Sequence, residues 1–163
     1  EQTITLSFPK VEPKLFSRIY LHSDNVGIKE LNLDIVAAYQ AGEDIIVELA
    51  YEDEVLNYSP ELDKLAKIET RGIILTAPSK NADRDFVSRF FAPRFGINED
   101  PVTGSAHCSL AILWSKKLGK SSLRAEQLSQ RRGFLELGIY QENVHLIGKS
   151  MTFSKGTITS VQP

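Results

Sequence analysis

The residues best suited to chemistry lie in one short segment, where two adjacent carboxylates precede the expected start of a helix. Glu99 and Asp100 come before Pro101, and the small residues of the run 103–106 (Thr-Gly-Ser-Ala) follow. The first backbone N–H groups of a helix have no partner within the helix, and they carry the positive end of its dipole. Small side chains leave these amides accessible to a ligand. The segment therefore predicts a binding position for a carboxylate or a developing oxyanion, with Asp100 beside it.

The same residue types also fit a purely structural role. Thr103 is a suitable N-cap for the helix, and the carboxylate of Asp100 can hold the turn by accepting hydrogen bonds from nearby amides. Glu99 has two interpretations as well. Neighbouring carboxylates can share a proton, which suits acid/base chemistry, but the side chains of adjacent residues often point apart. Spacing favours an exposed turn residue for Glu99.

Cys108 and His107 fall within the first turns of the expected helix. A cysteine in a helix that is apolar on most sides is expected to be packed, so a nucleophilic thiol is not predicted. His107 reaches either a ligand at the helix start or a backbone acceptor, and spacing leaves both open. His22 and His145 stand alone, without the spacing of metal ligands. Neither a metal nor another cofactor is therefore predicted.

Length and composition restrict the functional classes. The chain has 163 residues, 42% of them hydrophobic and 25% charged, which suits one domain with a packed core. Its 19 basic and 21 acidic residues predict no basic surface for a nucleic acid. No apolar run reaches the ~20 residues that span a bilayer, and the first residues do not resemble a secretory signal. With one cysteine and therefore no internal disulfide, we expect a cytoplasmic protein without nucleic-acid or membrane partners.

The pattern along the chain predicts an α+β roll, with strands wrapped around one buried helix. Apolar residues cover most sides of residues 104–118, and Gly119 is well placed to end this helix. A second, amphipathic helix is expected over residues 59–68, after a Ser-Pro-Glu start. Alternating or β-branched runs predict the strands, of which the first is half-buried and the continuous run 72–77 is central. The expected strands are 3–8, 33–39, 45–50, 72–77, 86–92, 123–129, 134–139, 143–147, 150–153 and 157–161.

The run 99–107 (Glu-Asp-Pro-Val-Thr-Gly-Ser-Ala-His) resembles the signature of the PhzF-like (phenazine biosynthesis) isomerase family. The run 89–93 (Arg-Phe-Phe-Ala-Pro) resembles the strand before that signature, and the run 6–9 (Leu-Ser-Phe-Pro) resembles the opening of the family's second domain. The family pattern Q-x-S-x-R-G-G is met by Gln127, Ser129, Arg131 and Gly133. Arg132 replaces the other glycine of this pattern, which leaves open whether a tight turn forms there.

The resemblance implies a fold like that of diaminopimelate epimerase, in which two similar α+β domains share an active site between the N-termini of their central helices. Residues 1–163 resemble the second, C-terminal domain and are expected to form a single domain. The site residues follow by position in the signature. The resemblance implies that the catalytic residues are Asp100 and Ser105, and that the substrate-binding residues are Thr103, Gly104, Ser105, Ala106 and His107.

The resemblance also implies that much of the machinery lies outside this chain. The family's principal acid/base glutamate and a helping histidine belong to its first domain, to which nothing here corresponds. We therefore expect half of a cofactor-independent isomerase that moves a proton on a small carboxylate-bearing metabolite. The other half would come from a complementary N-terminal domain, in a nicked or separately expressed enzyme, or from a second copy of the chain. The alternative is a non-catalytic binding or protein-interaction module that keeps the anion-binding helix terminus.

Overall fold

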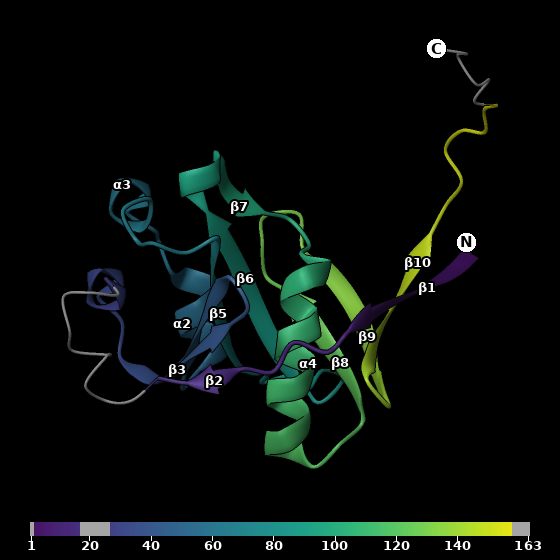
Figure 1. Cartoon of the computed structure of the whole chain (residues 1–163), viewed down its shortest axis with the longest axis horizontal. Coiled ribbons are helices and arrows are strands. Elements are labelled where there is room, and N and C mark those ends of the chain that lie inside the picture. Colours follow the sequence, from purple (N-terminus) through teal and green to yellow (C-terminus); the bar gives the residue numbers. More distant parts are fainter. Residues whose placement is uncertain (1, 17–26, 158–163) are drawn as a thin grey trace.

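In the computed structural model, which describes residues 2–16 and 27–157, one mixed sheet dominates the fold (Figure 1). Across these residues the strand order is β1-β10-β9-β8-β6-β5-β4-β3-β2, and β7 pairs with β6 beside this path. The pairs β4–β5 and β6–β8 are parallel, whereas the other neighbours are antiparallel. The strands are β1 Gln2–Pro9, β2 Lys14–Leu15, β3 Ile35–Ala41, β4 Asp44–Leu49, β5 Gly72–Pro78, β6 Phe86–Ala92, β7 Ile97–Asp100, β8 Ser122–Gln127, β9 Gly133–Tyr140 and β10 Asn143–Ser150.

Helices cover the two faces of this sheet unequally. The long helix α4 packs on one face, where its apolar side chains join those of strands β4 to β6 and β8 to β10 in one core cluster. Short helices contribute to a second cluster on the opposite face. The helical elements in the described residues are the 3-10 helices η1 Ile28–Leu31 and η2 Pro93–Phe95, and the α-helices α2 Glu52–Asn57, α3 Leu62–Leu65 and α4 Gly104–Leu118.

Helix α4 has the bounds that the sequence predicts. Every residue from Ala106 to Trp114 is buried, as expected for a helix that is apolar on most sides. The rings of Trp114 and Phe86 stack with centroids 5.5 Å apart, and the Trp114 indole Nε1 donates to Thr76 Oγ1 at 2.9 Å. Gly119 ends the helix with a φ of 66°, a left-handed conformation that favours glycine. The core thus fixes the position of α4 and of its N-terminus.

The centre of the sheet is buried on both faces. Along β5, Ile74 faces the cluster around α4, whereas Ile73 and Leu75 face the cluster under α2 and α3. On β6, Phe90 and Phe91 alternate in the same way. A strand that is covered on both sides needs apolar residues at consecutive positions, which explains the continuous apolar run of β5. The predicted α+β fold with a buried helix is therefore confirmed.

Two expectations about single elements were wrong. Strand β1 is not half-buried: Ile4, Leu6 and Phe8 are 46%, 51% and 41% exposed, because β1 lies at the edge of the described sheet and contributes no side chain to either core cluster. The helix expected over residues 59–68 is only the short α3, and the unpredicted α2 precedes it. Parallel strands such as β4 and β5 need a crossover connection, and the two short helices form it.

The C-terminal strands also differ from the prediction. The strand expected at 143–147 forms and continues to Ser150 as β10, because β1 pairs along its whole length, whereas the separate strand expected at 150–153 does not form. Residues 151–157 form no regular element. The strand expected at 157–161 falls largely outside the described residues, as does His22.

The turn between β8 and β9 contains a residue in a strained conformation. Arg132 has a φ of 58°, in the left-handed region that glycine adopts freely and other residues adopt at a cost. Its backbone N–H donates to the Ser129 carbonyl at 3.0 Å, and its guanidinium lies 3.1 Å from the fully buried carboxylate of Glu126. The tight turn therefore forms with arginine at this position.

We predict that Arg132→Gly gives a more stable protein than Arg132→Ala, by about 1 kcal/mol in the free energy of unfolding. Both variants lose the contact with Glu126, so the difference between them isolates the strain of the left-handed backbone. Urea unfolding followed by Trp114 fluorescence measures it. Equal stability of the two variants would show that the turn relaxes when the arginine is removed.

Candidate active site at the N-terminus of helix α4

A buried glutamine holds the turn that precedes α4. Gln127, at the end of β8, accepts a hydrogen bond from the Thr103 backbone N–H at 2.8 Å. Its Nε2 donates to the Asp100 carbonyl at 2.6 Å and to Thr103 Oγ1 at 3.1 Å. Gln127 is fully buried, so these bonds form away from water, where an unmade hydrogen bond is expensive. One side chain thereby fixes both ends of the turn from Asp100 to Thr103.

Ser129, in the turn after β8, and Gly133, at the start of β9, hold the middle of the same turn. Ser129 Oγ donates to the Pro101 carbonyl at 2.7 Å and accepts from the Arg132 backbone N–H at 3.1 Å. At Gly133 an added Cβ would come within 2.2 Å of Val102 Cγ2, so only glycine lets the strand approach the turn this closely. Gln127, Ser129 and Gly133, three residues of the Q-x-S-x-R-G-G pattern, therefore fix the turn.

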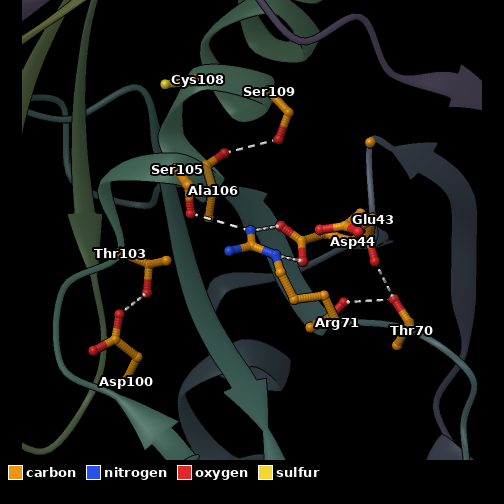
Figure 2. Close-up of polar contacts among 12 residues, drawn as sticks. Glu43, Asp44, Thr70, Arg71, Asp100, Thr103, Ser105, Ala106, Cys108 and Ser109 are labelled. Carbon is orange, nitrogen blue, oxygen red and sulfur yellow. Dashed lines mark hydrogen bonds and ion pairs between the residues drawn. The ribbon is translucent and has the colours of Figure 1, made fainter. Parts of the chain in front are cut away.

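Asp100 and Thr103 contact each other instead of capping the helix. Thr103 Oγ1 donates to Asp100 Oδ2 at 2.5 Å, as Figure 2 shows. No side-chain hydrogen bond caps α4 at Thr103. The first-turn amides of Gly104, Ser105 and Ala106 consequently have no side-chain cap within the described chain, and Ser105 is exposed. Asp100 and these amides lie at the same end of α4.

Sequence reasoning missed a charged side chain that contacts Ser105. Arg71, just before β5, donates from Nη2 to Ser105 Oγ at 3.1 Å (Figure 2). Asp44, at the start of β4, holds the guanidinium by accepting from Nε at 2.8 Å and from Nη2. Burial raises the pKa of Asp44, although Arg71 beside it acts in the opposite direction. The available signal was a charged residue at the start of each of two buried strands: Asp44 at β4 and Arg71 just before β5. Nothing in the sequence indicates that these two residues form a pair.

Glu99 has a structural partner. Arg89 binds its carboxylate through two hydrogen bonds, from Nε at 2.7 Å and from Nη2 at 3.0 Å. The remaining Nη1 of Arg89 donates to the carbonyls of Val55, Leu56 and Tyr58. This network ties β7 to α2, and it supports neither an acid/base role for Glu99 nor the exposed turn residue that spacing favours.

The side chain of His107 points into the core, away from the opening at Ser105. His107 is fully buried, its Nδ1 lies 2.7 Å from the Thr103 carbonyl and its Nε2 lies 3.4 Å from Ser88 Oγ. A carbonyl only accepts, so Nδ1 carries the proton and Nε2 accepts from the serine hydroxyl. Burial lowers the pKa of His107 to about 4, so the ring is neutral near pH 7. This placement argues against a direct contact between the His107 side chain and a substrate, which the family resemblance implied.

Cys108 is buried, as the sequence predicts. Its Sγ lies 3.6 Å from the Gly104 carbonyl, and burial raises the pKa of the thiol. A thiol that is both buried and protonated is a poor nucleophile. Within residues 2–16 and 27–157, no group of three or more His, Cys, Asp or Glu side chains is arranged to hold a metal ion. No helix in these ranges has the length and apolar character to cross a membrane.

Comparison with known proteins finds relatives in the family that the sequence resembles. The model of a family described as phenazine biosynthesis-like protein matches residues 1–156. An uncharacterized isomerase from Halalkalibacterium halodurans is 38% identical over 151 residues, which cover 91% of this chain and 55% of that protein. One from Pseudomonas aeruginosa is 37% identical over 159 residues, which cover 97% of this chain and 58% of that protein. The chain thus spans a little more than half the length of these relatives.

A solved structure supports the fold independently. The crystal structure of a phenazine biosynthesis protein of the PhzF family from Enterococcus faecalis matches with a TM-score of 0.81 and 34% sequence identity. The match covers 96% of this chain and 57% of that one. Both the strand arrangement and the buried helix therefore agree with the fold class that the sequence predicts.

We predict that Gln127→Met lowers the free energy of unfolding by about 1–3 kcal/mol, because it leaves the buried Thr103 N–H without an acceptor at nearly unchanged side-chain volume. The matched control is Gln130→Met, at an exposed position three residues beyond β8. Urea unfolding of both variants checks the prediction. A loss at Gln127 no larger than the loss at Gln130 would contradict the role of Gln127 in holding the turn.

We also predict a pH effect that depends on His107. Its pKa falls from 6.5 to about 4 on folding, so between these values the unfolded chain binds a proton that the folded chain does not. Stability is therefore unaffected above pH 6.5 and decreases as the pH falls from 6.5 toward 4, by on the order of 3 kcal/mol. Denaturant unfolding of the wild type and of His107→Asn, whose amide can still donate to Thr103, measures the difference in slope. Parallel pH profiles would contradict the prediction.

Proposed function

Since the chain belongs to the phenazine biosynthesis-like protein family, we propose that it supplies half of the active site of a cofactor-independent isomerase. The proposed reaction moves a proton within a small metabolite that carries a carboxylate. The observation on which this proposal rests is the placement of Asp100 beside the uncapped first turn of α4, in a turn that Gln127 holds rigidly. A carboxylate for the proton and amides for an anion are the two groups that such a reaction needs.

The substrate carboxylate would bind at the start of α4. The amides of Gly104, Ser105 and Ala106 lie at the positive end of the helix dipole, and the Ser105 hydroxyl adds a further donor. Gly104 has no side chain to obstruct an approaching ligand. A negative charge that develops on the substrate when a proton leaves is stabilised by the same donors, for which about 3 kcal/mol per donor is typical.

Asp100 would orient the substrate or assist the proton transfer. Its Oδ2 accepts from Thr103, and Oδ1 has no partner among the described residues. An isomerase of this kind removes a proton from one carbon and returns one to another, so the substrate neither gains nor loses atoms. The main base for these steps would come from the other half of the enzyme, as the family resemblance implies.

The partner that completes the site is part of the proposal. The chain covers 55–58% of the length of its curated relatives, so a complementary domain accounts for the remainder of those proteins. A second copy of the chain is the other candidate, since two such helix N-termini can face each other. In either arrangement the first turn of α4 lies at the surface where the two halves meet.

The activity is tested by incubating the gene product that contains these residues with a panel of small carboxylate metabolites in D₂O. Mass spectrometry then detects deuterium incorporated at carbon. For any metabolite that exchanges, Asp100→Asn is expected to lower the rate by about 10²–10⁴-fold, because it removes the carboxylate that takes part in proton transfer. Ser105→Ala is expected to lower it by about tenfold or more, because one donor to the anion is lost.

The matched control for Asp100→Asn is Asp53→Asn, at an exposed position on α2. Equal exchange rates for the two variants would exclude Asp100 from the reaction. The alternative, a non-catalytic binding module, would be supported if the wild type binds carboxylates at α4 but exchanges no deuterium into any of them.

A further inference from the structure

Asp44 and Arg71 form a pair that stability alone does not explain. Asp44 is 3% exposed, and a carboxylate at such a position is costly to bury unless a cation neutralises it. Apolar residues at the two positions would avoid this cost, as a buried ion pair seldom stabilises a fold more than a packed apolar pair does. The consequence of the pair is geometric, because Nε and Nη2 of Arg71 are both fixed by one carboxylate (Figure 2).

The orientation that Asp44 imposes brings Arg71 to Ser105. A guanidinium has five N–H donors, and three of them are used: two by Asp44 and one, on Nη2, by Ser105 Oγ. The two hydrogens on Nη1 have no partner among the described residues. Because Ser105 Oγ accepts from Arg71, its own hydroxyl hydrogen is left for a ligand.

The surroundings of Arg71 are built to keep it in place and accessible. The Phe90 ring lies under the guanidinium, with its centroid 5.7 Å from the Arg71 Cζ. A Cβ at Gly72 would come within 2.2 Å of that ring, so glycine is needed there for Phe90 to occupy this position. The side chain of Arg71 is nevertheless 38% exposed, and it lines an open surface pocket of about 760 Å³ together with Phe90, Phe95 and Ile97. Of the charged residues in this lining, Arg94 adds a second cation, whereas Glu43 and Glu69 are acidic.

We propose that Arg71 is a specificity-determining residue that binds the carboxylate of the substrate through Nη1, while it orients the Ser105 hydroxyl toward the same carboxylate. This inference rests on the proposed function and adds the cation that selects the substrate class. The substrate is a small carboxylate whose apolar body extends from Arg71 along the side chains of Phe95 and Ile97. Asp44 is a positioning residue, which acts on the ligand through Arg71.

The inference is tested with benzoate as the probe and benzamide as its neutral isostere. Both are titrated into the ¹⁵N-labelled 163-residue chain, and NMR follows the Ser105 and Ala106 amides and the Arg71 Nε. We expect benzoate, but not benzamide, to shift these signals. Arg71→Gln should weaken benzoate binding by about tenfold or more, because a hydrogen bond to a charged group is lost.

Two further variants make the test specific. Arg71→Lys keeps the charge but loses the planar fork that contacts both Asp44 and Ser105, so its affinity is expected to lie between those of the wild type and Arg71→Gln. Arg124→Gln, on the exposed side of β8, removes a cation elsewhere and should leave the affinity unchanged. The amide spectrum shows whether each variant is folded. If Arg71→Gln does not fold, the affinity of Arg71→Lys for benzoate tests the inference instead.

The outcomes separate the two proposals. If the amides of α4 shift equally in the wild type and in folded Arg71→Gln, with the same affinity, Arg71 does not select the ligand and only this inference fails. If benzoate leaves the amides of the wild type unshifted, the carboxylate site of the proposed function fails, and the inference fails with it.

Discussion

The structure depends on a helix start that is rigid and yet uncapped. Thr103 occupies the N-cap position of α4, but its hydroxyl donates to Asp100 and its backbone N–H donates to Gln127. Because Gln127 also binds the Asp100 carbonyl, Thr103 cannot rotate toward the amides of α4 without breaking bonds that are buried. The donors at the start of the helix therefore remain unpaired, although a residue well suited to cap them is present.

An uncapped helix start has a cost, which the rest of α4 offsets. Loss of an N-cap typically destabilises a protein by about 1 kcal/mol. The residues from Ala106 to Trp114 are buried in the larger core cluster, and one well-buried side chain of the size of leucine contributes about 2 kcal/mol or more. The helix therefore forms without its cap. Packing along its length, and not local propensity at its first turn, holds the candidate active site in position.

Features that depend on residues close together in the sequence could be predicted, whereas features that depend on residues far apart could not. The bounds of α4 and of β6 follow from local patterns: an apolar segment between Thr103 and Gly119 for the helix, and a run rich in aromatic and apolar residues that Pro93 ends for the strand. The exposure of β1 could not be predicted, because alternation identifies an apolar face but not what covers it. The pairing of Arg71 with Asp44 and Ser105 joins residues 27 and 34 positions apart, and only the sheet topology brings them together.

Two arginine–carboxylate pairs flank the turn before α4, and their differences indicate their roles. Arg89 uses all three of its nitrogens, on Glu99 and on three backbone carbonyls, and its side chain is only 11% exposed, so it joins β7 to α2 and offers a ligand little access. Arg71 has the same bidentate contact with a carboxylate, but its third nitrogen is unused within the described chain and its side chain is partly exposed. At this exposure that nitrogen is open to water or to a ligand. A solvent-facing donor on a side chain that is otherwise held rigidly suits the preorganised binding of an anion, since the ligand then meets donors that are already in place.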